Sequence, residues 1–563
     1  MDFKKELITL LSKELGEIIL KKEDFTSLIS VPPDQRLGDY AFPCFKLGKN
    51  PKEEAEKLKA RIKLSKSFSK IEVAGPYLNF FICPEVLAKE TLTKIFKEKE
   101  DYGIGKDKKE IVIEFCGPNT NKPLHLGHVR NMAIGDATRR ILVKQGNNVH
   151  PVNIINDRGI HICQSMIAYQ KWGKGKTPDK KGDHFVGDYY VLFSKKSKED
   201  ETMKAEAQEL LLKWEQGDKE TIKLWKQMNK WVLEGFKETY QRFGIKFEKE
   251  YSESDYYQNG KEIVLEGLKK KKFHKNEEGA IVVNLEEFNL PNKVVLRADG
   301  TSIYITQDMY LAQLRYDDFK FNKMVYVVAS EQNNHFKQLF KILELLNKPY
   351  ANNLYHLSYG LVNLPSGRMK SREGTVVDAD DIMNEISSLA ETEIRKRYDQ
   401  LSEKDIKKRA EMIALGAIKF FMLKTDASRD IIFNPEESLS FEGETGPYLQ
   451  YTHARSCSIL RKAEKNNVVN DFSLLSTNSE LAILKLLNQF PEKIKESAAN
   501  YKPHLICRYL LDLAQAYNEF YHQSQVISED KELMNARLHL VDSVRQVLHN
   551  GLDLLGIKSP EEM

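Results

Sequence analysis

Cysteine is scarce in this chain: six of its 563 residues are cysteine, and no two of them have the spacing of metal ligands. A structural zinc site is therefore not expected, because such sites draw their ligands from closely spaced cysteines and histidines. A disulfide framework is not expected either, since so few cysteines cannot cross-link so long a chain effectively. The six are Cys44, Cys83, Cys116, Cys163, Cys457 and Cys507.

Long apolar runs and a strong excess of one charge are also missing. No apolar run reaches the roughly 20 residues that cross a bilayer. The opening stretch MDFKKELITLLSKELG spreads charges among its apolar positions, which predicts an amphipathic helix and not a signal peptide. We therefore expect a cytoplasmic protein with no membrane partner. The net charge is only +4, so any binding of nucleic acid must rest on local patches.

Strands and helices alternate in the middle of the chain. The apolar run IVIEF (111–115) is followed by a polar loop and a helical pattern from about Leu126, and VHPVNIIN (149–156) is a second strand. The alternation resumes at VVLRADG (294–300) and MVYVVAS (324–330). Such alternation indicates βαβ units, and hence a Rossmann-like parallel sheet in an α/β fold.

Changes in composition and hydrophobic periodicity divide the chain into four regions, a number that its length also suggests. Residues 1–105 combine a helix, a Pro/Gly-punctuated stretch and a strand, which predicts an α+β domain. Residues 106–375 hold the parallel sheet, with a Lys/Glu-rich helical insertion at about 165–250 whose four tryptophans we expect in the core. Helical periodicity then dominates, in a linker at 376–430 and in an all-helical bundle at 431–563.

The loop after the first central strand reads CGPNTNKPLHLGHVRN and centres on His125, Gly127 and His128. It lies where a strand ends and a helix begins, at the edge where open α/β sheets bind ligands. A helix N-terminus offers N–H groups and partial positive charge to a phosphate, and Gly127 lets a nucleotide approach the backbone. The arrangement suits nucleotidyl transfer, with the imidazoles stabilising an attacked α-phosphate and Lys122 adding a cation for the departing phosphates. In isolation, two such histidines are more often ordinary residues of a helix start.

A second, glycine-bracketed loop has the sequence LPSGRMKSREGT (364–375). Its cations can close over a triphosphate, although a solvated basic turn explains the loop equally well when it is taken alone. The predicted catalytic residues are His125, His128, Lys122 and Arg372. The predicted ATP-binding residues are Gly127, His125, His128, Arg368, Met369 and Lys370.

Together the two loops resemble the HIGH and KMSKS signatures of class I aminoacyl-tRNA synthetases. Longer stretches across nearly the whole chain are similar to arginyl-tRNA synthetases: EFCGPNTNKPLHLGHVRN, VNIINDRGIHI, DGTSIYITQD, VYVVASEQ, GRMKSREG, FEGETGPYLQYTHARSCSILRK and LLGIKSPEEM. The resemblance implies a class I synthetase fold and ATP-dependent ligation of L-arginine to tRNA(Arg) through an arginyl-adenylate, with release of AMP and pyrophosphate. It also implies ATP with Mg²⁺ as the substrate complex, no zinc, a monomer, and a need for bound tRNA before the adenylate forms.

The second loop departs from the KMSKS pattern, because its first lysine position holds Arg368 and its fourth holds Ser371. Arginyl enzymes commonly relax this motif, and the resemblance implies that Lys122 compensates. We therefore expect Lys122 and Arg372 to share the role of binding the phosphates.

Recognition of arginine needs a group that pairs with a planar cation, which a carboxylate does in a two-pronged geometry. Tyr304 and Asp308 are four apart at the start of a helix and therefore share a face. Taken alone, Asp308 is equally typical of a helix-start acid. By resemblance, Asp308 holds the guanidinium beside Tyr304, Glu114 faces the substrate ammonium, Asn119 lies near the substrate carboxylate, and Gln332 is a further substrate position.

Three areas are candidates for contact with tRNA. One of them, the basic cluster of Arg139, Arg140 and Lys144, is better explained as solvated charge. Tyr77 and Asn79 lie two apart on a strand and share a side, which suits stacking on and reading an unpaired base, although a core tyrosine beside a strand asparagine gives the same pattern. By resemblance, residues 1–105 meet the D-loop corner of the tRNA and residues 376–430 contact its stem. The residues of the helical bundle that match positions at the anticodon loop are Tyr451, Arg455 and Met563.

Three other functions fit parts of the pattern. A small-molecule nucleotidyltransferase also uses HxGH, but it does not need the two flanking domains. A non-catalytic tRNA-binding relative would not need to keep the motif residues and Asp308 intact. A class I synthetase for another amino acid, cysteine for example, would show spaced zinc cysteines, which this sequence lacks.

Overall fold

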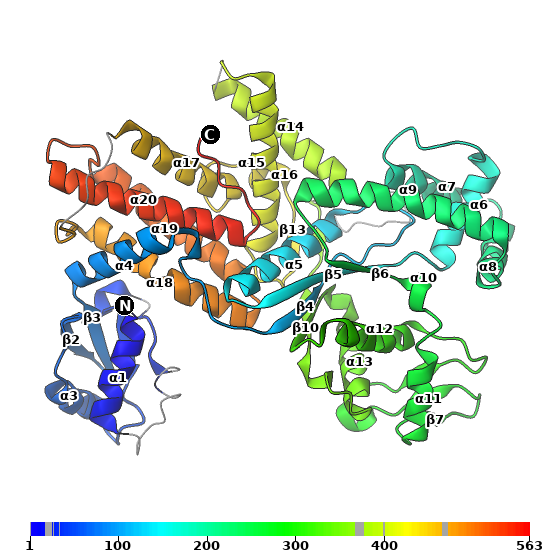
Figure 1. The fold of residues 1–563 in the computed structure, drawn as a ribbon, viewed down its shortest axis with the longest axis horizontal. Coiled ribbons are helices and arrows are strands. Elements are labelled where there is room, and N and C mark those ends of the chain that lie inside the picture. Colours follow the sequence, from blue (N-terminus) through cyan, green and yellow to red (C-terminus); the bar gives the residue numbers. More distant parts are fainter. Residues whose placement is uncertain are drawn as a thin grey trace.

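The computed structural model describes residues 2–16, 25, 28–32, 34–365, 377–397, 400–463 and 471–563. Figure 1 shows a small N-terminal body, a central sheet between helices, and a group of long C-terminal helices. The predicted fold class is confirmed, with a parallel α/β sheet, an N-terminal α+β part and a C-terminal all-helical part. No helix in the described ranges is long and apolar enough to cross a membrane.

The N-terminal body is a three-stranded antiparallel sheet covered by helices. Its elements are α1 (Phe3–Leu15), η1 (Gln35–Leu37), β1 (Tyr40–Pro43), α3 (Pro51–Arg61), β2 (Phe68–Ala74), β3 (Tyr77–Ile82), α4 (Pro84–Glu98) and η2 (Lys99–Asp101). The strand order is β1-β3-β2. Leu78, Phe80 and Ile82 alternate along β3 and are buried in the same core as Leu7 of α1 and Leu58 of α3.

The central sheet has five parallel strands in the order β11-β10-β4-β5-β6. Their bounds are β4 (Glu110–Glu114), β5 (Asn148–Ile155), β6 (Lys249–Ser252), β10 (Lys323–Ala329) and β11 (Leu354–Tyr359). The helices that pack on the sheet are α5 (Leu126–Lys144), α12 (Tyr304–Phe319) and α13 (Asn333–Leu345). Ile111 and Ile113 enter the core that contains α5, while Val112 enters the core of α12 and α13. Glu114 continues the Val112 side and so points toward α12.

Four helices are inserted between β5 and β6. They are α6 (Ile160–Trp172), α7 (Gly182–Lys196), α8 (Thr202–Glu215) and α9 (Lys219–Phe243). Trp214 is buried and Trp225 and Trp231 are partly buried, but Trp172 is 40% exposed. The core prediction is therefore wrong for Trp172, which is the last residue of α6 and extends past the packed part of that helix.

A second segment, between β6 and β10, forms a small antiparallel sheet in the order β7-β8-β9 and then leads into α12. Its elements are α10 (Glu253–Tyr256), α11 (Lys261–Lys269), β7 (His274–Lys275), β8 (Ile281–Val283), η3 (Glu286–Phe288) and β9 (Lys293–Leu296). The stretch VVLRADG therefore belongs to this side sheet and not to the parallel sheet, because a short apolar run does not specify its partner strand.

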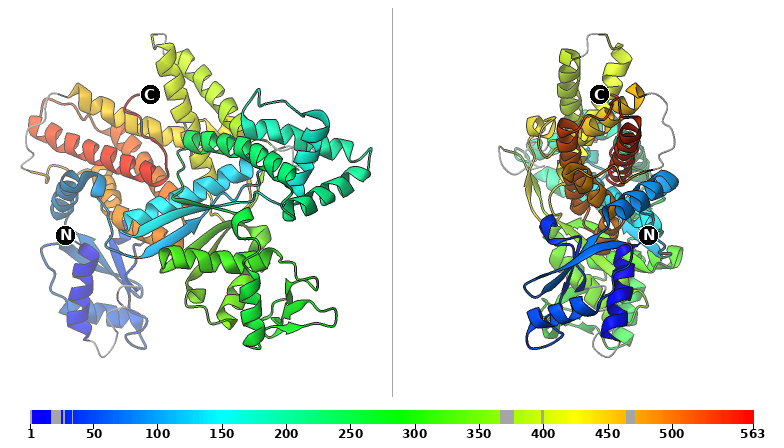
Figure 2. Two further views of the ribbon diagram at one scale, coloured as in Figure 1. Left: turned by 45° about the vertical axis from the view of Figure 1, so that its right-hand side comes forward. Right: turned by 90° about the vertical axis from the view of Figure 1, so that its left-hand side faces the viewer.

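Long helices build the C-terminal part. After η4 (Ser330–Gln332) and η5 (Ala351–Asn353), the elements are β12 (Val362–Asn363), α14 (Ala379–Arg397), α15 (Glu403–Leu423), β13 (Ile431–Ile432), α16 (Pro435–Ser438), α17 (Gly446–Lys462), α18 (Asn478–Asn500), α19 (His504–Gln523) and α20 (Lys531–Leu554). Figure 2 shows these helices above the N-terminal body, whose α4 packs on α18 and α20. The segment after α20 runs along α17, where the carbonyl of Pro560 accepts a hydrogen bond from His453 (2.8 Å).

Helix α5 joins the central sheet to these C-terminal helices. Near its far end, the buried Asp136 pairs with Arg139 and Arg140, at 2.7 Å each. Arg140 also reaches Asp553 in the last turn of α20, at 3.0 Å. The half of α5 that lies away from the HxGH motif therefore contacts the C-terminal bundle through the ion pair between Arg140 and Asp553.

Candidate active site

At the N-terminal tip of α5, the side chains of both histidines accept hydrogen bonds from backbone N–H groups. His125 is the N-cap residue, and its Nδ1 accepts the backbone N–H of Gly127 at 3.1 Å. Nδ1 of His128 accepts the backbone N–H of His125 at 3.1 Å, and the ring centres lie 3.9 Å apart. Because both Nδ1 atoms accept, the proton of each neutral ring sits on Nε2, and each ring offers one N–H donor.

Both imidazoles are neutral near pH 7. Burial, together with the positive charge of Lys122, lowers the pKa of His125 to about 3. Burial, together with His125 and Lys122, also lowers the pKa of His128 well below its usual range. Two neutral N–H donors at a positive helix end can stabilise charge that develops on a phosphate, and they do so without titrating near neutral pH.

The absence of a side chain at Gly127 leaves room for the ring of His125 and also lets a ligand approach the backbone. A Cβ at this position would lie 3.0 Å from both Nδ1 and Cε1 of His125. Any side chain there would press on the ring and shift the Nε2–H donor.

The loop that leads from β4 to the tip is held by asparagines that the motif does not reveal. Cys116 has a φ of +82°, a strained value for a residue with a side chain. Asn131 of α5 accepts its N–H at 2.5 Å, and Asn153 of β5 accepts the N–H of Gly117 at 3.0 Å. The expected substrate residue Asn119 lies exposed in this loop.

The second loop is described only at its two ends. Before it, β12 pairs with β13. After it, the carbonyl of Val377 accepts the N–H of Leu126 at 3.1 Å, and the N–H of Ala379 donates to the carbonyl of Leu124 at 2.8 Å. The chain therefore returns from this loop onto the tip of α5. Four predicted site residues lie outside the described residues and stay predictions: Arg368, Met369, Lys370 and Arg372.

Lys122 lies near the imidazoles, since its charge contributes to the lowering of both of their pKa values. Burial lowers the pKa of Lys122 itself, while the carboxylate of Asp378 opposes that shift. A partly desolvated ammonium interacts more strongly with a phosphate than a solvated one does.

We expect Lys122→Met to slow ATP–pyrophosphate exchange about 10- to 100-fold, because it removes one of two cations expected on the phosphates. The exchange is measured with tRNA present, and Lys174→Met, at an exposed lysine, is the matched control. If both variants exchanged at the wild-type rate, Lys122 would have no role in holding the phosphates.

Three of the five predicted arginine-binding residues lie near the starts of α12 and α13. Tyr304 is 76% exposed, so its ring is open to a ligand. One turn later, the carboxylate of Asp308 accepts a hydrogen bond from Nε2 of His335 at 2.6 Å. Gln332 is exposed in η4, immediately before α13. An exposed aromatic ring near a partly exposed carboxylate suits a planar cation. The sequence motifs give no signal for His335.

Glu114 already has a cationic partner inside the protein. Its carboxylate forms an ion pair with the guanidinium of Arg315 on α12, and both side chains are buried. The rings of Tyr251 and Tyr326 flank that guanidinium, at 5.2 and 5.7 Å from ring centre to Cζ. A substrate ammonium would therefore share a carboxylate that Arg315 neutralises, and the predicted role of Glu114 stays a prediction.

The two N-terminal residues expected at tRNA differ in exposure. Tyr77 is 38% exposed and packs edge-on against Phe45, with ring centres 5.6 Å apart. Asn79 is buried, because it lies on the central strand and a Cβ at Gly38 would come within 3.5 Å of its Cβ. Tyr77 is thus accessible to a base in this structure, whereas Asn79 is not.

Two of the three candidate residues of the helical bundle, Tyr451 and Arg455, lie together on α17. The guanidinium of Arg455 stacks over Tyr451 at 4.8 Å and over Tyr521 at 5.1 Å, and it donates to Asn518 at 2.8 Å. Met563 is partly buried against the helical core. The shared face of Tyr451 and Arg455 is therefore present.

All six cysteines are free thiols. Among the described residues, the group of three potential ligand side chains close enough to share a metal ion contains no cysteine. That group is Asp183, His184 and Asp380.

Comparison with known proteins extends these observations over the whole chain. Residues 91–435 match the family model "tRNA synthetases class I (R), catalytic domain". Residues 449–563 match the DALR anticodon binding domain, and residues 5–82 match the arginyl tRNA synthetase N terminal domain.

Relatives of known name cover nearly the full chain. The chain is 48% identical to an arginine–tRNA ligase of Treponema denticola, over 95% of this chain and 94% of that protein. It is 42% identical to the arginine–tRNA ligase of Borrelia turicatae, over 100% and 99%. The structure of Thermus thermophilus arginyl-tRNA synthetase superposes with a TM-score of 0.87 at 28% identity, and each chain is covered fully.

The parallel sheet, the HxGH helix tip and the helical C-terminal part define a class I aminoacyl-tRNA synthetase. Within that class, the chain belongs to the arginyl-tRNA synthetase family.

Proposed function

We propose that this chain activates L-arginine with ATP and transfers it to tRNA(Arg) for translation, and that the tip of α5 carries the first step. In that step the arginine carboxylate attacks the α-phosphate of ATP, the bond to the β-phosphate breaks, and pyrophosphate leaves. A terminal ribose hydroxyl of the tRNA then displaces AMP from the arginyl-adenylate. The observation that carries the proposal is the pair of neutral imidazoles, whose Nε2–H donors lie at a helix N-terminus.

The parts of the site divide the work. His125 and His128 stabilise the attacked phosphate, and the backbone at Gly127 lies close to the nucleotide. Lys122 and Arg372 hold the leaving phosphates, and ATP enters as its Mg²⁺ complex. The second loop adds further ATP contacts from Arg368, Met369 and Lys370.

The amino-acid pocket is proposed around Asp308. Its carboxylate already accepts one hydrogen bond from His335, which orients it, and its second oxygen can take the guanidinium. Tyr304 packs on the planar cation, and Asn119, Glu114 and Gln332 contact the other end or sides of the substrate.

The tRNA is proposed to lie across several parts of the chain. Residues 1–105 meet its D-loop corner, 376–430 its stem, and 431–563 its anticodon loop. Residues 106–375 hold the reaction centre. Contacts with phosphates make this binding weaker at higher salt. The enzyme acts as a cytoplasmic monomer in this proposal, without zinc.

The residues proposed to read bases do so by stacking and hydrogen bonding. They are Tyr77, Asn79, Tyr451, Arg455 and Met563. Because Asn79 is buried in the structure without tRNA, its role requires the segment around Gly38 to move.

The direct test is to charge total tRNA with each labelled amino acid separately. We expect arginine alone to become acid-precipitable, with omission of ATP as the control. Charging of cysteine or another amino acid would assign a different specificity. Absence of any charging would favour a nucleotidyltransferase or a non-catalytic tRNA-binding protein.

A further inference from the structure

The segment that follows the second loop lies between two parts of the fold that are far apart in sequence. On one side, Val377 and Ala379 make the backbone hydrogen bonds to the tip of α5 described above. On the other side, Asp380 meets the start of α7, the second helix of the insertion. Four residues of chain therefore connect the insertion to the imidazole tip.

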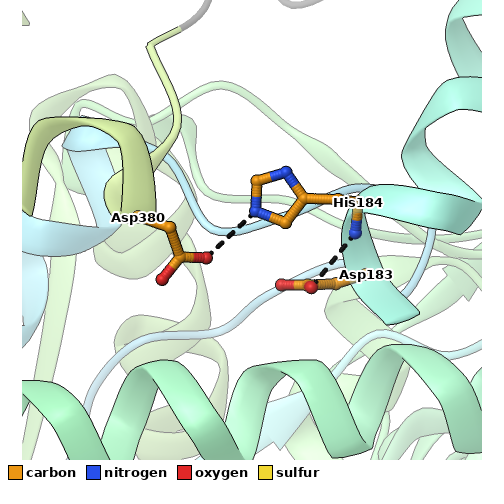
Figure 3. A group of neighbouring side chains, drawn as sticks. All are labelled: Asp183, His184 and Asp380. Atoms are coloured by element: carbon orange, nitrogen blue, oxygen red, sulfur yellow. Dashed lines mark hydrogen bonds and ion pairs between the residues drawn. The ribbon is translucent and has the colours of Figure 1, made fainter. Parts of the chain in front are cut away.

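A compact charge cluster makes the second contact. Nζ of Lys181 lies 2.6 Å from Asp380 and 3.0 Å from Asp183, and Nε2 of His184 lies 3.0 Å from the same carboxylate oxygen of Asp380. Thr239 of α9 contributes a hydroxyl at 3.3 Å from Asp380. Asp183 is fully buried, and the side chains of Lys181 and Asp380 are 17% and 14% exposed. Figure 3 shows the ring of His184 directed at Asp380, while the backbone N–H of His184 donates to Asp183.

This cluster is built as an internal ion-pair network and not as a metal site. The ligand atoms of Asp183, His184 and Asp380 do lie within 4.8 Å of one another. However, the ammonium of Lys181 already lies on both carboxylates and supplies the cation that they need.

The network continues from His184 toward the phosphate-holding lysine. The other ring nitrogen of His184, Nδ1, lies 3.7 Å from the carboxylate of Asp378. Asp378 forms a backbone bridge with His125 and acts electrostatically on Lys122. A series of neighbouring charged side chains therefore connects the insertion to the reaction centre, in the order Lys181, Asp380, His184 and Asp378.

Helix α7 also packs directly on the segment before the HxGH motif. A Cβ on Gly187 would lie 2.8 Å from Cδ of Pro123 and 3.5 Å from Cα of Lys122. Only a glycine permits so close an approach without movement. The same helix thus touches the backbone of Lys122 and, through the charge cluster, the segment that pairs with the tip of α5.

We propose that the start of α7 positions Lys122 and the α5 tip for the attack of the arginine carboxylate on ATP. Asp380 is the positioning residue that joins α7 to the α5 tip. This inference rests on the proposed function and adds a role for the helical insertion. Lys181 and His184 hold Asp380, the bridge at 377–379 holds the tip of α5, and the charge of Asp378 acts on the ammonium of Lys122. This positioning role does not require contact with arginine from any of the four side chains of the network, which are Lys181, His184, Asp378 and Asp380.

The test compares Asp380→Asn with Asp381→Asn, which makes the same charge change at an exposed carboxylate on the same helix turn. We expect Asp380→Asn to lower kcat of ATP–pyrophosphate exchange about 10- to 100-fold, since a small misplacement of reacting groups costs that much. The KM for arginine should stay unchanged, and Asp381→Asn should behave as wild type. Transfer of arginine to tRNA from separately supplied arginyl-adenylate should also be unchanged, because that step no longer needs the leaving phosphates.

Two more variants separate positioning from folding. Lys181→Arg keeps the cation and should keep most of the exchange rate, whereas Lys181→Met should lose it. Asp380→Asn itself leaves Lys181 paired with the buried Asp183, so this variant should unfold near the wild-type temperature and still exchange slowly.

Wild-type exchange in Asp380→Asn would overturn the inference. So would equal losses in exchange and in transfer from the adenylate, or a wild-type exchange rate in Lys181→Met. A wild-type chain that makes no arginyl-tRNA would instead overturn the proposed function itself.

Discussion

Replacing His128 with glutamine should slow adenylate formation about 10²- to 10³-fold while leaving α5 folded, because a single preorganised donor to a developing charge is worth that much. Glutamine at this position can still accept the backbone N–H of His125, as it does in many helix capping boxes. The ring Nε2–H is lost. The variant therefore separates the donor role of the imidazole from its capping role.

The measurement is single-turnover formation of arginyl-adenylate at saturating ATP, arginine and tRNA. His128→Ala serves as the comparison, since it should lose the same rate and also about 1 kcal/mol of stability with the cap. Thermal unfolding checks that difference. A glutamine variant with wild-type kinetics would show that the imidazole does not act on the phosphate.

Replacing Asp308 with alanine should raise the KM for arginine about 30-fold or more, because breaking a close charge pair costs about 2–5 kcal/mol. The KM for ATP should change little, since Lys122 and the imidazoles lie in the β4–α5 loop and at the tip of α5, and not on α12. Steady-state exchange with tRNA present gives both constants. The expected effect exceeds that of any surface charge, because the carboxylate is only partly exposed and already oriented by His335.

Asp317→Ala is the matched control, since Asp317 is an exposed acid on the same helix that pairs with Lys320. It should leave both KM values unchanged. Equal behaviour of the two variants would remove Asp308 from the arginine pocket, and the guanidinium would need another acceptor.

The fold and the helix tip could be predicted from sequence because their signals are local. The HxGH residues sit within one strand–loop–helix unit, so residues a few positions apart already specify which groups meet. The alternation of IVIEF with a helical pattern likewise predicts the parallel strands that position the loop. The same holds for Tyr451 and Arg455, which share a face through helical spacing alone.

The remaining parts of the site depend on contacts between distant segments. His335 reaches Asp308 across 27 residues, and His184 reaches Asp380 across 196. Arg315 meets Glu114 only because α12 packs on β4. No periodicity encodes such pairings, since each side chain could equally face solvent until the tertiary packing is known.

The burial of individual side chains could not be predicted from the sequence either. Period-two alternation correctly places Tyr77 and Asn79 on one side of their strand, but it does not say that another segment covers Asn79. Trp172 shows the converse, because helical spacing predicts a shared face without saying where the packed part of the helix ends.

Helix α5 also has a mechanical consequence. Its 19 residues form a rod about 28 Å long, with the imidazoles at one end and the ion pair from Arg140 to α20 toward the other. Tilting such a rod by about 2° moves its tip by about 1 Å, a displacement that can change a reaction rate about 100-fold. A macromolecule that binds the C-terminal bundle and rotates α5 slightly would therefore displace the imidazoles relative to the reacting phosphate. A small rotation at the bundle would in this way change the rate of the chemical step.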